Sequence, residues 1–281
     1  MAKGPLQSAN KESSAIWPEV WSAFAPHREK ITKLLISVAN PSRGKLCVWG
    51  AGRTTDLDLI TLLEHYKQID LVDIRTSLTQ QALVERGFDE HPCVNLLPAM
   101  DLSGLDSHWK RISELPDRDK LGEIAKLCSE FAPELGQYDV VVSTCLLSQI
   151  LIHTVKHLEL ASGIRSKDPS LFGALKVIRE KHIELLIEHT LPGGTALLVT
   201  DLTSREKLPK LLESNVDLEQ LISTEVIGGN HFHGLNPKLI VDLAQSPGMS
   251  GRLRDVNVSG PWVWDSVEMQ YLCLAFRFGK R

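Results

Sequence analysis

Two glycines and a carboxylate are spaced in this sequence as in a nucleotide-binding site. Gly50 and Gly52 follow the apolar run at residues 46–49, and without Cβ atoms they let the backbone turn sharply and approach a ligand closely. Asp73 lies 73 − 52 = 21 residues after Gly52, close to the roughly 20-residue spacing at which a strand-end carboxylate meets a bound ribose. The predicted ligand is an unphosphorylated adenosine derivative. The alternative is an ordinary strand-to-helix turn with a solvated acid.

A strand-turn-helix unit is needed to position these residues. Residues 46–49 predict a buried strand, and residues 69–74 predict a second strand with Asp73 at its end. The helix after the glycine turn is expected to face the sheet through Leu57, Leu59, Ile60, Leu62 and Leu63. Thr54, Thr55 and Asp56 are candidates for the first turn or the cap of that helix.

Three further strands are predicted, and each leads into a polar residue. They are residues 93–97 before Asp101, residues 138–143 before Thr144, and residues 195–200 before Asp201. Carboxyl ends of parallel strands share one edge of a sheet, so Asp101, Ser143 and Thr144 are expected beside Gly50 and Asp73. Asp101 could accept a hydrogen bond from an adenine amino group or cap the next turn, and both readings stay open.

Helical periodicity and turn signals predict the remaining elements. Two short helices at 17–38, interrupted near Pro26, are interpreted as packing elements rather than a lid. The other predictions are helices at 77–86, within 103–137, in two pieces over 146–191 broken around 162–168, at 207–213 and at 237–244 capped by Asn236; a turn at 191–194; and strand-like runs at 255–264 and 270–278.

Composition restricts the function. The 281 residues are 43% apolar and 23% charged, with a net charge of −4, so no global basic field indicates a nucleic-acid partner. The five cysteines are scattered without a C-x-x-C pair, which favours a reducing cytoplasm. No apolar run approaches the ~20 residues of a membrane span, and we expect no membrane partner.

The ordered motifs of the chain resemble those of class I S-adenosylmethionine-dependent methyltransferases. They are Val48-Trp49-Gly50-Ala51-Gly52, Asp73, Asp101-Leu102, the run 138–143 and Leu191-Pro192-Gly193-Gly194-Thr195. The resemblance implies a three-layer, Rossmann-like α/β sandwich with a mostly parallel seven-stranded sheet, an antiparallel C-terminal strand and an N-terminal helical extension. It divides the chain into a mobile tail (1–15), N-terminal helices (16–44) and one methyltransferase-like domain (45–281) with helical insertions near 103–137 and 146–190.

The resemblance also implies S-adenosyl-L-methionine as cofactor and an enzyme of the EC 2.1.1 class. Gly50 and Gly52 would lie by the methionine part, Asp73 would bind the ribose, Asp101 and Leu102 would face the adenine, and Ser143 would lie near the transferred methyl. The full set of cofactor-binding candidates is Gly50, Ala51, Gly52, Asp73, Ile74, Asp101, Leu102, Ser143 and Thr144. Two positions depart from the family pattern: Val48 replaces an acid and Thr54 replaces a third glycine, which leaves the amino-acid end of the cofactor with fewer partners.

Methyl transfer needs a base only when the nucleophile arrives protonated. The candidates are His231 and His233 in a glycine-flanked loop and Asp201 at a strand end. Each histidine could equally be a surface residue, and Asp201 could be a helix cap. His153 and His157 are spaced i, i+4, but no third ligand is placed near them, so we predict no metal site.

The acceptor is predicted to be a small molecule. The segment 143–146 differs from the [DN]-P-P-[FYW] signature associated with methylation of amino groups on bases or glutamine. Trp262, Trp264, Phe232 and the N-terminal tryptophans could line an apolar pocket or belong to the core. An NAD-dependent oxidoreductase is a second hypothesis, although Thr55 stands at the third glycine position of its motif. A non-catalytic nucleotide-binding protein of the same fold is a third, motivated by Val48 and Thr54.

Overall fold

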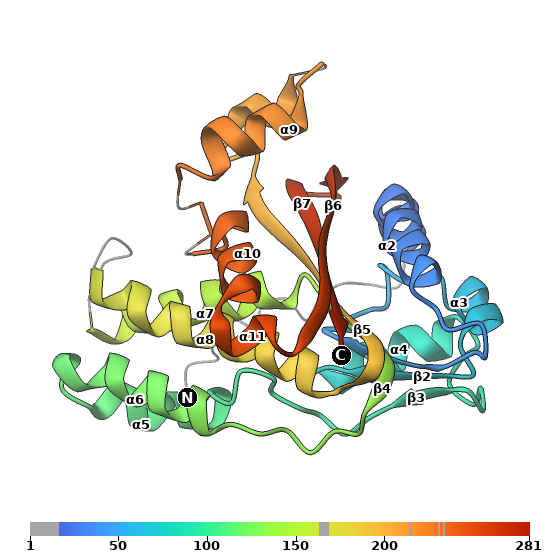
Figure 1. The fold of residues 1–281 in the computed structure, drawn as a ribbon, viewed down its shortest axis with the longest axis horizontal. Helices are drawn as coiled ribbons and strands as arrows, with labels where there is room; N and C mark the ends of the chain where they lie inside the picture. The colour runs from blue at the N-terminus through green and yellow to red at the C-terminus, as the bar shows by residue number, and fades with distance from the viewer. Residues whose placement is uncertain (1–16, 163–168, 214, 230, 233) are drawn as a thin grey trace.

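A seven-stranded sheet forms the centre of the molecule (Figure 1). The computed structural model describes residues 17–162, 169–213, 215–229, 231–232 and 234–281; the predicted tail at 1–15 and most of the predicted helix break at 162–168 lie outside them. The strands are β1 (Lys45–Trp49), β2 (Gln68–Val72), β3 (Val94–Leu96), β4 (Tyr138–Thr144), β5 (Thr190–Ser204), β6 (Leu253–Asp265) and β7 (Gln270–Lys280).

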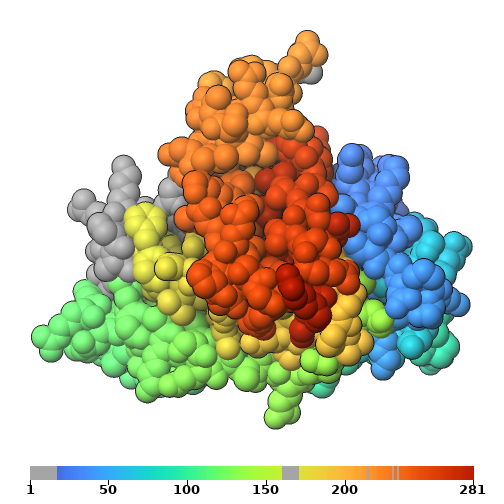
Figure 2. All heavy atoms as spheres, in the orientation of Figure 1, coloured from blue at the N-terminus to red at the C-terminus, as the bar shows by residue number. Residues whose placement is uncertain are grey.

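The strand order is β3-β2-β1-β4-β5-β7-β6. The five strands from β3 to β5 are parallel, whereas β7 runs antiparallel to both β5 and β6. The predicted fold class is therefore confirmed, including the antiparallel C-terminal pair. In Figure 2 the C-terminal segments, coloured orange to red, fill the middle of the visible face, between the blue N-terminal helices and the green and yellow helices.

Helices cover both faces of the sheet, and the alternation of side chains along the strands explains why. In β1, Leu46 and Val48 join one core cluster and Cys47 and Trp49 join the other, because successive strand residues point to opposite faces. The helices are α1 (Trp17–Ala23), α2 (Ala25–Ser37), α3 (Leu59–His65), α4 (Thr76–Glu85), α5 (Trp109–Glu114), α6 (Asp117–Glu130), α7 (Leu146–Ser162), α8 (Pro169–Glu188), α9 (Leu218–Leu221), α10 (Pro237–Gln245) and α11 (Pro247–Ser250).

Three helices, α2, α3 and α4, cover one face of the sheet, and α5 to α8 and α10 contribute to the core of the other. Short turns of helix complete the structure at η3 (Asp106–His108), η4 (Pro209–Leu212) and η5 (Ile222–Val226). None of the helices in the described part of the chain is both long and apolar enough to cross a bilayer.

The second N-terminal helix, α2, packs against the sheet. Phe24 separates α1 from α2, and Pro26 lies in the first turn of α2, where its missing N–H is tolerated. Ile31 and Leu35 are fully buried in the same core cluster as β1. On the same helix, the buried His27 ring stacks on Trp264 of β6 with centroids 4.5 Å apart. The helix α2 therefore joins the sheet at its β6 side.

Two predicted helix boundaries were wrong. The helix after the glycine turn begins only at Leu59, and Asp58 caps it by accepting a hydrogen bond from Thr61 N–H at 3.2 Å; Thr54, Thr55 and Asp56 precede the cap in an irregular loop. The helix predicted at 207–213 is a four-residue 3₁₀ turn that begins at Pro209, because the proline ring disfavours helical backbone at the preceding residue, Leu208. The helix capped by Asn236 is confirmed.

The predicted turn at 191–194 is a bulge inside β5. Tyr138 pairs with Thr190 and Val140 pairs with Thr195, so Asp139 alone faces residues 191–194. Gly193 has φ +80, a conformation that glycine adopts without strain. The strand then continues through Asp201 to Ser204, beyond its predicted end, because β7 pairs with it along this length.

Candidate functional site

The glycine loop lies where the strand order reverses. The first strand in sequence, β1, has β2 on one side and β4 on the other, and ligands of open α/β sheets bind at such a switch point. Gly50 N–H and Ala51 N–H both donate to Val72 O, at 2.9 and 3.2 Å. A Cβ on Gly50 would lie 2.9 Å from Leu146 Cβ. Only glycine therefore fits at the point where the loop passes the start of α7.

Asp73 and the glycine loop are in direct contact. Gly52 N–H donates to Asp73 Oδ2 at 2.8 Å, and Arg75 N–H donates to Asp73 Oδ1 at 2.7 Å. An ionised carboxylate has about four acceptor positions, so each oxygen can accept one further hydrogen bond. Asp73 is partly exposed, and a Cβ on Gly52 would meet no atom closer than 4.0 Å. These two residues thus fit a ribose diol that approaches the edge of the sheet.

Asp101 acts as a cap in this structure. Its Oδ1 accepts from Ser103 N–H at 2.8 Å and Ser103 O–H at 2.6 Å, and its Oδ2 accepts from Leu105 N–H and Asp106 N–H, both at 2.7 Å. The acceptor positions of the carboxylate are filled. Of the two roles considered for Asp101, the structure shows that of a cap for the following turn. An adenine amino group would therefore need another acceptor.

The other predicted adenine neighbours are apolar and differ in exposure. Leu102 is buried, with 5% of its surface exposed, whereas Ile74, next to the ribose candidate Asp73, is 43% exposed. The exposed Ile74 side chain can pack against a flat ring where it stands. The buried Leu102 side chain would first have to leave the protein core. Ile74 is therefore the better placed of the two for such a contact.

Ser143 and Thr144 lie beneath the loop rather than in front of it. Ser143 is fully buried and its Oγ lies 2.9 Å from His182 Nε2 of α8. Thr144 Oγ1 is 3.2 Å from Trp49 O and 3.2 Å from Gly50 O, so its hydroxyl ties the end of β4 to the start of the glycine loop. Both side chains support the edge. The resemblance implied a position near a transferred methyl for Ser143, but its side chain is covered.

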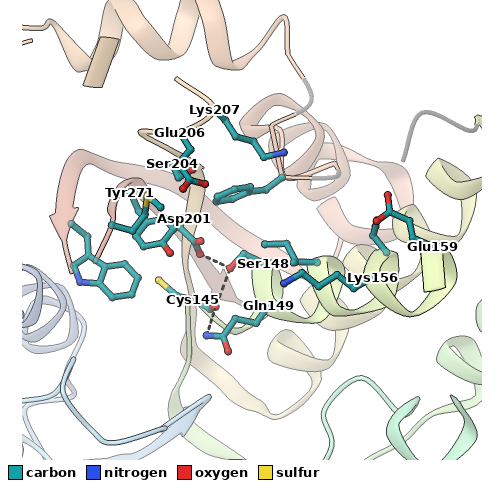
Figure 3. A pocket seen from close by; sticks show the side chains of 15 residues that line it. Cys145, Ser148, Gln149, Lys156, Glu159, Asp201, Ser204, Glu206, Lys207 and Tyr271 are labelled. Atoms are coloured by element: carbon teal, nitrogen blue, oxygen red, sulfur yellow. Dashed lines mark hydrogen bonds between the residues drawn. The ribbon is translucent and has the colours of Figure 1, made fainter. Parts of the chain in front are cut away.

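Beside the switch point the protein contains a cavity of about 520 Å³. It opens over the ends of β4 and β5 and is lined by, among others, Cys145, Ser148, Asp201, Phe232, Trp264 and Tyr271 (Figure 3). Cys145 is the first residue after β4 and has φ +48, so the chain turns abruptly from the strand into α7. The size is within the range that holds a small organic ligand.

Asp201 and Ser148 form the polar floor of this cavity, and Figure 3 shows them pointing toward each other. Ser148 O–H donates to Asp201 Oδ1 and also lies 3.0 Å from Cys145 O. Burial raises the pKa of Asp201 from its ordinary value of 3.8 to about 6, since a low-dielectric surrounding disfavours the charged form. A carboxylate with this pKa can act as a base near neutral pH.

Aromatic side chains form one wall of the cavity. Trp264 and Tyr271 lie with ring centroids 5.1 Å apart, and Phe232 lies 6.4 Å from Tyr271. Of the aromatic residues considered from the sequence, Phe232 and Trp264 line the cavity, and the N-terminal tryptophans do not. Trp262 lies behind the wall, where its Nε1–H donates to His27 Nδ1 at 3.0 Å.

Of the three predicted bases, Asp201 lines the cavity. His231 is not among the lining residues, and its Nε2 lies 3.4 Å from Glu225 O; His233 lies outside the described residues. His153 and His157 face each other with Nε2 atoms 3.1 Å apart. Within the described ranges no group of three or more potential metal ligands occurs.

Sequence reasoning missed Ser148 and Tyr271. Ser148 follows Cys145 by one turn of α7, and Tyr271 pairs with Ser204 across β5 and β7. A serine near a strand end carries no signal by itself. The strand pairing that brings Tyr271 to Ser204 joins segments that are distant in sequence, so no local pattern could reveal it.

The strand order and the loop-to-acid contact define a Rossmann-like α/β protein with ligand-binding geometry at its switch point. No family model matches the sequence, and no curated protein matches it. Several solved structures that are similar in fold are methyltransferases. The N-methyltransferase NodS from Bradyrhizobium japonicum WM9 has 11% sequence identity, a TM-score of 0.43 and coverage of 91% of this chain and 97% of that chain.

Two further structures are similar over most of this chain. An O-methyltransferase family protein from Burkholderia thailandensis has 12% identity and a TM-score of 0.46, with 91% of this chain and 55% of that chain covered. Human N-acetylserotonin methyltransferase in complex with SAM has 14% identity and a TM-score of 0.43, with 97% and 60% covered. This chain thus spans less than two thirds of either protein. All three TM-scores are below 0.5.

Proposed function

We propose that this protein is an S-adenosylmethionine-dependent methyltransferase of the EC 2.1.1 class that acts on a small molecule. The observation that carries the proposal is the contact between Gly52 N–H and Asp73 Oδ2, 2.8 Å long, at the switch point of the sheet and beside a ligand-sized cavity. Free thiols at all five cysteines support a cytoplasmic location, where thiols stay reduced.

The cofactor, when bound, supplies an electrophilic methyl group on a sulfonium sulfur. Asp73 would accept hydrogen bonds from the ribose hydroxyls through the acceptor positions that Gly52 and Arg75 leave free. Ile74 would cover one face of the adenine, and the backbone of Gly50 and Gly52 would lie along the amino-acid end. Val48 is fully buried in the core and offers no polar group there.

The acceptor would lie in the cavity between Asp201 and the aromatic wall. Asp201 would take the proton of a hydroxyl or protonated amine, and Ser148, which donates to its Oδ1, would hold the carboxylate in place. Trp264 and Tyr271 would cover an apolar or aromatic body and exclude water, which favours an in-line displacement. Single bases of this kind contribute roughly 10²–10⁴-fold to a rate.

The two other hypotheses receive less support. In an oxidoreductase we would expect a further segment for the second substrate, yet β6 and β7 place residues 253–265 and 270–280 in the same sheet. A non-catalytic binding protein would not need a carboxylate with a raised pKa in a cavity, and Asp201 has one.

Calorimetry with S-adenosylmethionine, S-adenosylhomocysteine and NAD, side by side, tests the proposal. We expect saturable binding of the first two and none of NAD. Asp73→Ala removes hydrogen bonds to a charged group, each worth about 1.5–3 kcal/mol, so binding should weaken by roughly 10–100-fold or more. NAD binding in place of the sulfur compounds would refute the proposal.

Asp139→Ala is a matched control for the Asp73 variant. Like Asp73, Asp139 accepts a hydrogen bond from a backbone N–H that is distant in sequence, that of Lys45 at 2.7 Å. Asp139 lies at the start of β4, however, and thus at the opposite edge of the sheet. Equal loss of affinity in both variants would indicate general destabilisation. Transfer of a labelled methyl group to a panel of hydroxylated and amino aromatic compounds then identifies the acceptor.

A further inference from the structure

One residue of the glycine loop has an unfavourable backbone conformation. Thr54 has φ +55 and is buried, with 1% of its surface exposed. Left-handed backbone is rare for β-branched residues, because the Cβ substituents crowd the neighbouring carbonyl. Thr54 is also the position at which the family pattern has a third glycine, so the loop needs a device that holds this conformation without one.

Arg86, directly after α4, supplies three hydrogen bonds to this loop. Its NH1 donates to Thr54 O at 3.1 Å and to Thr54 Oγ1 at 2.7 Å, and its NH2 donates to Leu57 O at 3.2 Å. The planar guanidinium can bind several acceptors in one fixed geometry, which a lysine cannot do. Arg86 therefore fixes both the carbonyl and the side chain of the strained residue.

Arg28 of α2 holds the next carbonyl. Its NH1 donates to Thr55 O at 3.0 Å and to Trp21 O at 3.0 Å. Both guanidiniums also contact one indole: Arg28 Cζ lies 3.5 Å and Arg86 Cζ lies 4.2 Å from the ring centroid of Trp21. Cations in this position are attracted by the π-electrons of the ring.

These three residues come from separate elements and meet only at the loop. Trp21 is in α1, Arg28 is in α2 and Arg86 follows α4. The two guanidiniums carry like charges, and burial together with Arg28 lowers the pKa of Arg86 to about 10. Both stay protonated at neutral pH, so charged donors reach Thr54, Thr55 and Leu57 in the folded protein.

We propose that Trp21, Arg28 and Arg86 form a clamp that holds residues 52–57 in the shape that binds the cofactor. The inference rests on the proposed function, since the loop begins with Gly52, whose N–H meets Asp73. The clamp turns the carbonyls of the loop away from the ligand edge and compensates for the missing third glycine. The N-terminal helices α1 and α2 are thereby a required part of the cofactor site, although they touch no reacting atom.

A double-mutant cycle between Arg86 and Thr54 tests the clamp. Arg86→Ala should raise the Kd for S-adenosylhomocysteine at least tenfold in calorimetry. Thr54→Gly alone should raise that Kd less than Arg86→Ala does, because glycine adopts positive φ without strain. In the Arg86→Ala background, Thr54→Gly should restore most of the lost affinity. Unchanged affinity in Arg86→Ala, or failure of glycine to restore it, would overturn the proposal.

Arg43→Ala is a matched control, because Arg43 donates to Leu63 O and Tyr66 O at the far end of α3 and should leave the Kd unchanged. If Arg86→Ala does not fold, Arg86→Lys and Trp21→Leu replace it with the same expected direction. Should the wild type bind neither sulfur compound, the proposed function fails, but the clamp is still tested by thermal unfolding. Thr54→Gly must then raise the Tm more in the Arg86 variant than in the wild type, and additive changes would refute the clamp.

Discussion

Replacing Asp201 by asparagine should stabilise the protein at neutral pH and at the same time slow the proposed methyl transfer by roughly 10²–10⁴-fold. The carboxylate is buried, and burial raises its pKa from 3.8 to about 6. One pKa unit corresponds to about 1.4 kcal/mol, so ionising Asp201 in the folded protein is less favourable than in the unfolded chain by about 3 kcal/mol. Asparagine has nearly the same shape and no charge, and its amide oxygen can still accept from Ser148.

The sign of the pH effect follows from proton binding. Between pH values of about 4 and 6 the folded state holds a proton on Asp201 that the unfolded chain has lost, so stability falls as the pH rises through this interval. The asparagine variant has no carboxyl group at this position and does not lose stability in this way. We expect the difference in unfolding free energy between the two proteins to widen by about 2 kcal/mol from pH ~4 to pH ~7.5. Burial, and to a smaller extent the charge of Asp201, raises the pKa of Asp56 to about 7. Loss of the Asp201 charge in the variant therefore changes the difference in unfolding free energy in the same direction.

Urea unfolding at a series of pH values measures this difference. Other titrating groups are common to both proteins and largely cancel in the comparison. Asp89→Asn, at an exposed aspartate, makes the same substitution away from the cavity and is the matched control. A constant difference between the wild type and Asp201→Asn across the whole range would refute the reasoning, because it would mean that the carboxylate titrates alike in the folded and unfolded states.

Three further predictions concern groups near the same cavity. Ser148→Ala removes the hydrogen bond that lowers the pKa of Asp201, so the midpoint of the pH–rate profile should move to higher pH. Cys145, whose pKa is raised by a hydrogen bond with a neighbouring thiol and by burial, should resist iodoacetamide at neutral pH, whereas partly exposed Cys93 reacts, as mass spectrometry would detect. Burial lowers the pKa of His27 from 6.5 to about 3, so the stability that its neutral ring provides above pH 6.5 is lost as the pH falls toward 3. Urea unfolding should show that His27→Gln loses less unfolding free energy than the wild type over this interval.

Local patterns were sufficient for the strands and for the contact between the glycine loop and Asp73. Leu46 and Val48 alternate with Cys47 and Trp49, and this alternation is a property of any strand covered on both faces. The spacing between Gly52 and Asp73 encodes one strand-helix-strand unit, and the two residues meet at 2.8 Å. For the same reason Asn236 could be recognised as the cap of α10 before any tertiary contact was known.

Local patterns failed where several residues of similar propensity competed. Thr54, Thr55, Asp56 and Asp58 can all cap a helix, and the choice fell to Asp58 because Arg86 and Arg28 hold the residues before it in an irregular loop. Asp101 had two possible roles, and the turn that follows it occupies both of its oxygens.

The sequence by itself determined the order of the strands along the chain, their apolar faces and the loop-to-acid spacing, since each depends on residues within one strand-helix-strand unit. Only the tertiary structure decided which carboxylate lies in a cavity and what surrounds it. Asp201 and Ser148 are 53 residues apart, and Trp264 and Tyr271 reach them through the antiparallel pairing of β5, β6 and β7. Burial, and with it the pKa of Asp201, is created by chain segments that no window of sequence contains together.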